Sequence, residues 1–256
     1  MLEIRSVLAT LKSSLLHRGV FGTFRRIAAD PLYRFRDWQF DRKHNVRTAG
    51  FIAPEDLDID DIHKQSAVQY QPVRLHAFRR IMTMLAIDHQ EFTFVDFGCG
   101  KGRAMLLASE FPFRRILGVE LSPALCQAAR ENIRAYTSPT QQCKRLEVAC
   151  ADAAQYRVPR EPAVLFFYNP FDAQIMSPVL HNLEESLREA PRPLYLVLYN
   201  PVLDGLVKKT AWLRVYRATG QFSIYESVPW GAPKRRAEVS QSAIDPVTDP
   251  SRQGQR

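Results

Sequence analysis

The feature that most constrains this chain is a glycine-rich stretch that follows a short β-rich run at residues 92–97. It reads Val95-Asp96-Phe97-Gly98-Cys99-Gly100-Lys101-Gly102-Arg103, and residues 104–111 after it show helical spacing of apolar side chains. Gly98, Gly100 and Gly102 allow the backbone to approach a ligand closely, because they carry no Cβ atom. The helix that follows offers free N–H groups and a positive dipole end. The stretch therefore predicts a ligand-binding strand–turn–helix unit.

Short β-rich runs alternate with helical segments through the rest of the middle of the chain. Further strands are predicted at 115–120, 146–150, 163–168 and 194–199, helices at 72–85, 123–136 and 173–187, and a closing antiparallel pair at 212–217 and 222–226. Strands that alternate with helices are typical of a parallel sheet covered on both faces. We therefore predict a doubly wound α/β fold with a mostly parallel sheet of seven strands.

Both ends of the chain differ from this core. Residues 1–65 are predicted to form a helical basic arm and a linker, since Ile4, Leu8, Leu11 and Leu15 recur at helical spacing and bases cluster up to Lys43. Residues 66–228 form the predicted catalytic domain. Residues 229–256 contain four prolines and almost no large apolar groups, which predicts a disordered tail. The net charge of +8 permits the arm to pack on the core or to dock on nucleic acid or an anionic membrane surface.

Several classes of protein are disfavoured by what the sequence lacks. No apolar run approaches the roughly 18 residues of a membrane span, and the N-terminus does not have the order of a signal peptide. The four cysteines form no CxxC pair and no cluster with histidine, so we expect no disulfide scaffold and no metal site. His63, His76 and His89 are predicted to be solvated. These features predict a cytoplasmic protein.

Two carboxylates indicate the chemistry of the ligand. Asp96 lies two residues before the first glycine, where it suits a cation and not a pyrophosphate. Glu120 ends the next predicted strand, 22 positions after Gly98, where a carboxylate can bind ribose hydroxyls. The third glycine also comes one residue earlier than in the dinucleotide pattern G-x-G-x-x-G. The charges favour S-adenosylmethionine, and a nicotinamide-dependent oxidoreductase, using NAD(P), is the alternative.

The stretch from Asp96 to Asp152 resembles the class I S-adenosylmethionine-dependent methyltransferases, whose fold is Rossmann-like. The resemblance implies that Asp96, Gly98, Gly100 and Gly102 wrap the methionine part of the cofactor, that Glu120 binds its ribose, and that Asp152 contacts the adenine amine. Tyr70, in Tyr70-Gln71-Pro72, resembles a residue that some members place over the methionine part. The whole chain also resembles a set of bacterial proteins of similar length that share the basic arm.

The segment Asn169-Pro170-Phe171 resembles the motif of amine-methylating members, although the second proline of that motif is missing. The side-chain carbonyl of Asn169 can accept an N–H and aim a nitrogen lone pair at the methyl group, and Phe171 can stack on a flat or cationic acceptor. The expected reaction is methylation of a nitrogen on an unknown acceptor, either a protein side chain or a small molecule. A third hypothesis is a non-catalytic cofactor-binding module whose arm binds nucleic acid or membrane.

Overall fold

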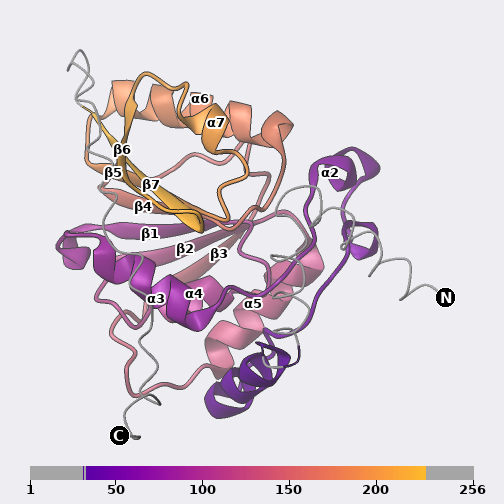
Figure 1. The fold of residues 1–256 in the computed structure, drawn as a ribbon. Coiled ribbons are helices and arrows are strands. Elements are labelled where there is room, and N and C mark those ends of the chain that lie inside the picture. Colours follow the sequence, from indigo (N-terminus) through magenta and orange to yellow (C-terminus); the bar gives the residue numbers. More distant parts are fainter. Residues whose placement is uncertain (1–30, 32, 229–256) are drawn as a thin grey trace, which may run out of the picture.

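Seven strands form one sheet in the order β3-β2-β1-β4-β5-β7-β6. The computed structural model describes residue 31 and residues 33–228 (Figure 1). The strands are β1 (Thr93–Phe97), β2 (Arg115–Glu120), β3 (Leu146–Cys150), β4 (Ala163–Phe167), β5 (Leu194–Tyr199), β6 (Leu213–Ala218) and β7 (Phe222–Ser227). Each lies within one residue of the corresponding predicted strand, and the mostly parallel α/β fold is confirmed.

The direction of the strands fixes where a ligand can bind. β1 to β5 run parallel to one another, whereas β7 runs antiparallel to both β5 and β6. From β1 the chain proceeds outward to β2 and β3, then returns to the other side of β1 with β4. The strand order therefore reverses between β1 and β4, and ligands of open α/β sheets bind beyond the carboxyl ends of the strands at such a point.

Helices cover both faces of this sheet. They are α2 (Asp61–Ser66), α3 (Leu75–Met84), α4 (Arg103–Ala108), α5 (Pro123–Ala135), α6 (Ala173–Glu189) and α7 (Asp204–Val207), with short 3₁₀ turns η1 (Pro54–Asp56) and η2 (His89–Glu91). Residues 33–44 are also helical. In Figure 1, α3, α4 and α5 lie on one side of the sheet and α6 and α7 lie on the other.

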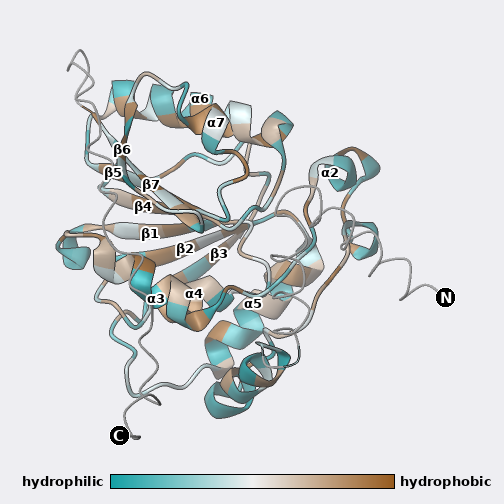
Figure 2. Ribbon diagram, in the orientation of Figure 1, coloured by the Kyte–Doolittle hydropathy of each residue, from teal (hydrophilic) through white to brown (hydrophobic). Residues whose placement is uncertain are grey.

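Alternation along the buried strands separates two apolar cores. In β4, Val164 and Phe166 face the core shared with α3 and α4, whereas Leu165 and Phe167 face the core shared with α6. Figure 2 shows hydrophobic colours on the central strands and hydrophilic ones on the outer sides of the helices. Asp96 lies two residues after Phe94 on β1, so both side chains are on the same face of the sheet. The Phe94 ring packs in the first core, and the Asp96 carboxylate therefore lies on the α4 side of the sheet.

Side-chain caps set where two helices start. Ser122 accepts a hydrogen bond from the Leu125 N–H at the start of α5, as its position before Pro123 predicts, and Asp172 caps α6 through the N–H groups of Gln174 and Ile175. The helical spacing predicted at 4–15 and the disordered tail predicted at 229–256 lie outside the described residues. Within the described residues, no helix combines the length and apolarity needed to cross a bilayer.

Candidate active site

A cavity that is open to solvent lies at the carboxyl ends of β1, β2, β3 and β4. Most of the residues selected from the sequence line it, namely Tyr70, Asp96, Gly98, Gly100, Glu120, Asp152, Asn169 and Phe171. Gly102 is the exception and does not line the cavity. The topology therefore brings together residues that are up to 101 positions apart in the sequence.

Asp96 is a buried carboxylate to which no described side chain donates a hydrogen bond or supplies a positive charge. Its side chain is 3% exposed, and burial together with the nearby Glu120 raises its pKa to about 8. A buried carboxylate without a counter-charge is costly, so the position favours either a proton or a bound cation. A cationic ligand fits this side of the cavity.

Glu120 is held by the backbone around it. One carboxylate oxygen accepts the Gly100 N–H at 2.8 Å, and the other accepts the N–H groups of Leu121 at 2.9 Å and Ser122 at 3.0 Å. Burial raises the pKa of Glu120, and these three bonds oppose that rise. An ionised carboxylate has about four acceptor positions. Three of these positions are used by backbone N–H groups, which leaves acceptor capacity on Glu120 for a further donor.

The backbone N–H groups of the glycine turn are used within the protein. Gly98 and Cys99 donate to the Val119 carbonyl at 2.8 and 3.1 Å, Gly100 donates to Glu120, and Gly102 donates to the Cys99 carbonyl at 2.8 Å. A pyrophosphate needs such groups free. Together with the buried Asp96, this arrangement argues against a dinucleotide in the turn.

The three glycines make room for protein atoms as well as for a ligand. All three have positive φ, at 71°, 54° and 85° for Gly98, Gly100 and Gly102. A Cβ on Gly98 would lie 2.4 Å from Pro170, and one on Gly100 would lie 2.3 Å from the Tyr70 ring. Glycine at these two positions lets the Asn169–Phe171 segment and the Tyr70 ring approach the turn. The ring of Tyr70 thus lies against the turn, and its hydroxyl donates a hydrogen bond to the Thr48 carbonyl at 2.7 Å.

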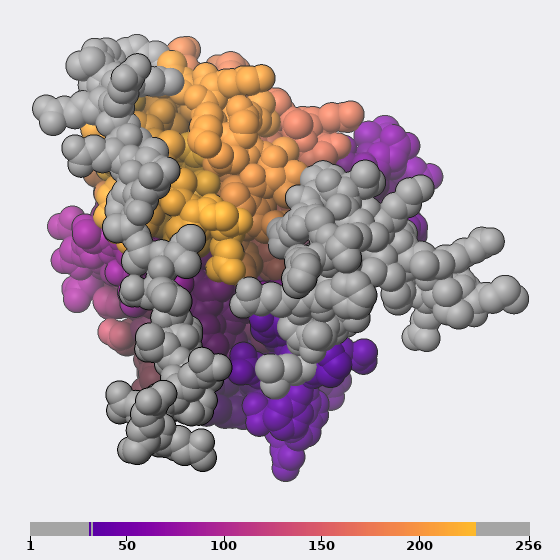
Figure 3. Space-filling model, in the orientation of Figure 1, coloured from indigo at the N-terminus to yellow at the C-terminus, as the bar shows by residue number. Residues whose placement is uncertain are grey.

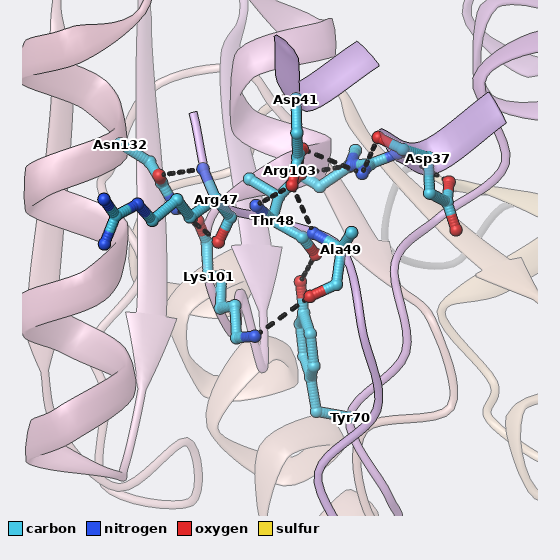
Figure 4. Close-up of polar contacts among 9 residues, drawn as sticks. All are labelled: Asp37, Asp41, Arg47, Thr48, Ala49, Tyr70, Lys101, Arg103 and Asn132. Carbon is cyan, nitrogen blue, oxygen red and sulfur yellow. Dashed lines mark hydrogen bonds and ion pairs between the residues drawn. The ribbon is translucent and has the colours of Figure 1, made fainter. Parts of the chain in front are cut away.

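Arg103 links the turn to the helix of residues 33–44. Its guanidinium is 2% exposed and donates to Asp37 at 2.8 Å, to Asp41 at 3.1 Å and to the Thr48 hydroxyl, as Figure 4 shows. It also lies 4.5 Å from the centroid of the Phe40 ring. A base at a helix N-terminus opposes the helix dipole. An arginine at this unfavourable position indicates that acidic partners lie nearby. The sequence patterns considered above did not identify this buried ion-pair network.

The segment of residues 47–49 runs across the same turn. Asp41 accepts the N–H groups of Thr48 and Ala49, both at 2.7 Å, and Lys101 donates to the Ala49 carbonyl at 3.0 Å. Asn132 on α5 accepts the Arg47 N–H at 2.7 Å and donates to the Lys101 carbonyl at 2.9 Å (Figure 4). These bonds hold both bases of the turn, Lys101 and Arg103, toward the N-terminal segment.

Asp152 lies in the wall of the cavity, two residues after the end of β3. Its carboxylate accepts the Ala154 N–H at 2.8 Å and lies 3.8 Å from Nε2 of His63. Nδ1 of His63 in turn lies 2.8 Å from the Asp60 carboxylate. The prediction that His63 is solvated is therefore wrong, because α2 carries it to the wall of the cavity. His89 is also not simply solvated, since its ring packs against Phe111 and Phe113.

Asn169 lies two residues after the end of β4, the strand that pairs with β1 and its Asp96. Its φ of 47° is left-handed, a conformation that asparagine tolerates better than most residues. The neighbouring segment 66–68 holds this turn, because Val68 donates to the Pro170 carbonyl at 3.3 Å and Asp172 donates to the Ser66 carbonyl at 3.0 Å. Phe171 lines the cavity, but it is only 8% exposed and its ring meets Phe167 edge to face. Its free area for stacking on an acceptor is therefore small.

No group of three or more histidine, cysteine or acidic side chains among residue 31 and residues 33–228 is placed to hold a metal ion. Cys99 is buried, and a Cβ added to Gly118 would lie only 2.7 Å from the Cys99 sulfur. It packs between the turn and β2.

Comparison with known proteins agrees with this geometry. The family model described as "Methyltransferase domain" matches residues 95–200. The chain is 28% identical over 141 residues to the ribosomal protein L11 methyltransferase of Klebsiella pneumoniae, covering 50% of this chain and 46% of the relative. It is 33% identical over 73 residues to the trans-aconitate 2-methyltransferase of Methylobacterium radiotolerans, covering 28% and 24%. The chain thus spans less than half the length of each of these curated relatives.

Solved structures with this type of fold are also similar. One is an RNA methyltransferase from Salinibacter ruber in complex with S-adenosyl-L-homocysteine, with 19% identity, a TM-score of 0.43, and coverage of 65% of this chain and 99% of that one. Similarity at this level does not indicate a substrate. The matched family covers β1 through β5, including the glycine turn, Glu120, Asp152 and Asn169. Residues 95–200, which hold most of the candidate site, are therefore similar to a methyltransferase domain.

Proposed function

We propose that this chain transfers a methyl group from S-adenosylmethionine to a nitrogen atom of a protein side chain or a small molecule. The cofactor, when bound, supplies a methyl group that is already electrophilic. The protein's part is then to align donor and acceptor and to exclude water. Asp96 supplies the negative charge for a cationic part of the cofactor, Glu120 an acceptor for a ribose hydroxyl, and Asp152 an acceptor for the adenine amine.

The observation that carries the nitrogen assignment is the position of Asn169. It lies at the switch point of the sheet and lines the same cavity as Asp96. Its side-chain carbonyl can accept an N–H of the acceptor and leave the nitrogen lone pair directed at the methyl group. Nitrogen needs only to arrive uncharged, whereas a phenol or a carbon acid needs a strong base.

The titratable groups around the cavity fit that requirement. Tyr70 donates its hydroxyl to Thr48, and burial raises the pKa of Tyr70, so it is not a base. His63 is engaged by two carboxylates, with Nδ1 2.8 Å from Asp60 and Nε2 3.8 Å from Asp152. Burial raises the pKa of the Cys99 thiol well above its usual value, so it stays protonated.

The names of the relatives support both kinds of acceptor. One is named for ribosomal protein L11 and the other for trans-aconitate, which is a protein in the first case and a small molecule in the second. Tyr168, Phe171 and Ile175 line the cavity together with Asn169, and none of these three side chains carries a charge. An uncharged, flat acceptor group fits these walls best.

Two matched variants test the proposal. Asn169→Gly removes the amide without adding strain at a positive φ, and Asn200→Gly is the control, because Asn200 precedes a proline at the end of β5 with a similar φ of 59°. The full chain is incubated with methyl-labelled S-adenosylmethionine and separated protein and small-molecule fractions of a cell extract. We expect Asn169→Gly to bind the cofactor within about twofold of wild type and to lose at least about 100-fold in labelling.

Asn200→Gly should retain both binding and labelling. Acid hydrolysis of the labelled product should leave the methyl group on nitrogen. Normal turnover by Asn169→Gly, or label that is released as from an ester, would refute the nitrogen assignment.

A further inference from the structure

The helix of residues 33–44 has an unusual division of its faces. Its inner face carries Asp37, Phe40, Asp41 and His44, and both acids of the helix are paired with the buried Arg103. Surface helices usually turn charge outward and apolar groups inward. Here both acids of the helix are turned inward, so its outer face contains no acidic residue to balance its bases.

The outer face combines two large aromatic side chains with bases. Phe35 is 52% exposed and Trp38 is 50% exposed, and their rings stack with centroids 5.8 Å apart. Arg34, Arg36, Arg42 and Lys43 are exposed on the same helix, and none forms an ion pair with a described residue. Figure 3 shows this segment, in indigo, at the surface of the protein, and Figure 2 shows its mixture of hydrophilic and hydrophobic residues.

We propose that this outer face, defined by Arg34, Phe35, Arg36, Trp38, Arg42 and Lys43, docks the protein on an anionic lipid surface. Exposed aromatic area and uncompensated bases on one helix are what an interfacial anchor needs, since the aromatics enter the headgroup boundary and the bases meet anionic headgroups. The inward pairing of Asp37 and Asp41 is what makes the face wholly cationic.

The arrangement of the rings favours lipid over single-stranded nucleic acid. A base-stacking platform needs a free aromatic face. In this helix Phe35 and Trp38 stack on each other, and the Arg42 guanidinium lies 5.3 Å from the Trp38 centroid. Insertion of the Phe35 and Trp38 rings into a lipid interface does not need a free ring face, because their exposed apolar area and ring edges are sufficient.

The test measures co-sedimentation of the full chain with two kinds of vesicle. One kind is pure phosphatidylcholine, and the other is phosphatidylcholine with 30 mol% phosphatidylglycerol. The second composition, about one-third anionic lipid, resembles a charged leaflet. We expect binding to the anionic vesicles that weakens as salt is raised, and at least about tenfold weaker binding to the neutral ones. Arg42→Glu/Lys43→Glu should lower the partition coefficient by about 25-fold or more. Phe35→Ser/Trp38→Ser should lower it as well.

The control is Lys209→Glu/Arg217→Glu, which makes the same change of charge at two exposed bases near β6 and should retain most of the binding. Circular dichroism confirms that each variant is folded. Equal loss in the control, or no binding of the wild type to anionic vesicles, overturns the proposal. Binding of a single-stranded RNA oligonucleotide that is lost in Arg42→Glu/Lys43→Glu, without vesicle binding, overturns it in favour of a nucleic-acid partner.

Discussion

Replacement of Arg103 by methionine tests how the N-terminal helix is joined to the glycine turn. Methionine keeps much of the length of the side chain but removes the charge that pairs with Asp37 and Asp41, whose side chains are only 21% and 13% exposed. Burial already raises the pKa of Asp37, and Arg103 counteracts that effect. Breaking a buried pair by removing one partner costs about 3–5 kcal/mol. Because both carboxylates retain some contact with water, we expect the lower limit, about 3 kcal/mol.

For a domain of this size that loss corresponds to a fall in melting temperature of roughly 6–12 °C. Calorimetry measures this fall, and the control is Arg160→Met, which breaks the ion pair between Arg160 and Glu189. The side chains of that pair are 68% and 58% exposed, so its loss should cost under about 1 kcal/mol. Adding Asp37→Asn and Asp41→Asn to Arg103→Met should recover part of the loss, because the uncompensated charges are then gone. Equal destabilisation by Arg103→Met and Arg160→Met, or no recovery in the triple variant, would show that the network is not a coupled unit.

Two further predictions concern the glycine turn. Gly100→Ala should lower both stability and cofactor affinity, because the residue has a φ of 54° and its new Cβ would meet the Tyr70 ring. The control is Gly205→Ala in α7, where a Cβ would have no atom within 4 Å. This variant should melt at or above the wild-type temperature. Equal melting of the two would contradict this reasoning. Asp96→Asn should abolish cofactor binding yet stabilise the unliganded protein as pH rises. The folded-state pKa of Asp96, about 8, lies above its usual value, so the folded protein keeps a proton that the unfolded chain has lost between roughly pH 4 and 8. The free energy of unfolding of the wild type should therefore decline across that window relative to that of Asp96→Asn. Denaturant unfolding at several pH values measures both free energies, and a difference between them that does not change with pH would refute the raised pKa of Asp96.

The parts of the fold that sequence could predict are those set by local pattern. The strands from Thr93 to Ser227 carry alternating or continuous apolar runs, and the start of α5 has a serine cap followed by proline. The motif spacing also located Asp96 and Glu120 at the ends of adjacent strands. These features depend on neighbours within a few residues, so they can be read without knowing the tertiary structure.

The contacts that complete the site are long-range, and that is why the sequence did not show them. Arg103 meets Asp37 across 66 positions, Tyr70 meets Thr48 across 22, and His63 reaches Asp152 through the placement of α2. Nothing in the local pattern of the arm distinguishes Asp37 and Asp41 from the solvated acids of the linker. Similarly, the occupation of the Glu120 oxygens by three backbone N–H groups depends on the exact path of the turn.

These long-range contacts also set the charge of the cavity. Asp96, Glu120 and Asp152 follow or end three neighbouring strands, and both bases of the turn are turned away from them, Lys101 toward Ala49 and Arg103 toward the N-terminal helix. Arg103 still lines the cavity, at the first position of α4. Its guanidinium is paired with Asp37 and Asp41, so neither base of the turn compensates the cavity carboxylates. The N-terminal helix thus engages a base that lines the cavity, and the buried Asp96 is left without a counter-charge from a described side chain.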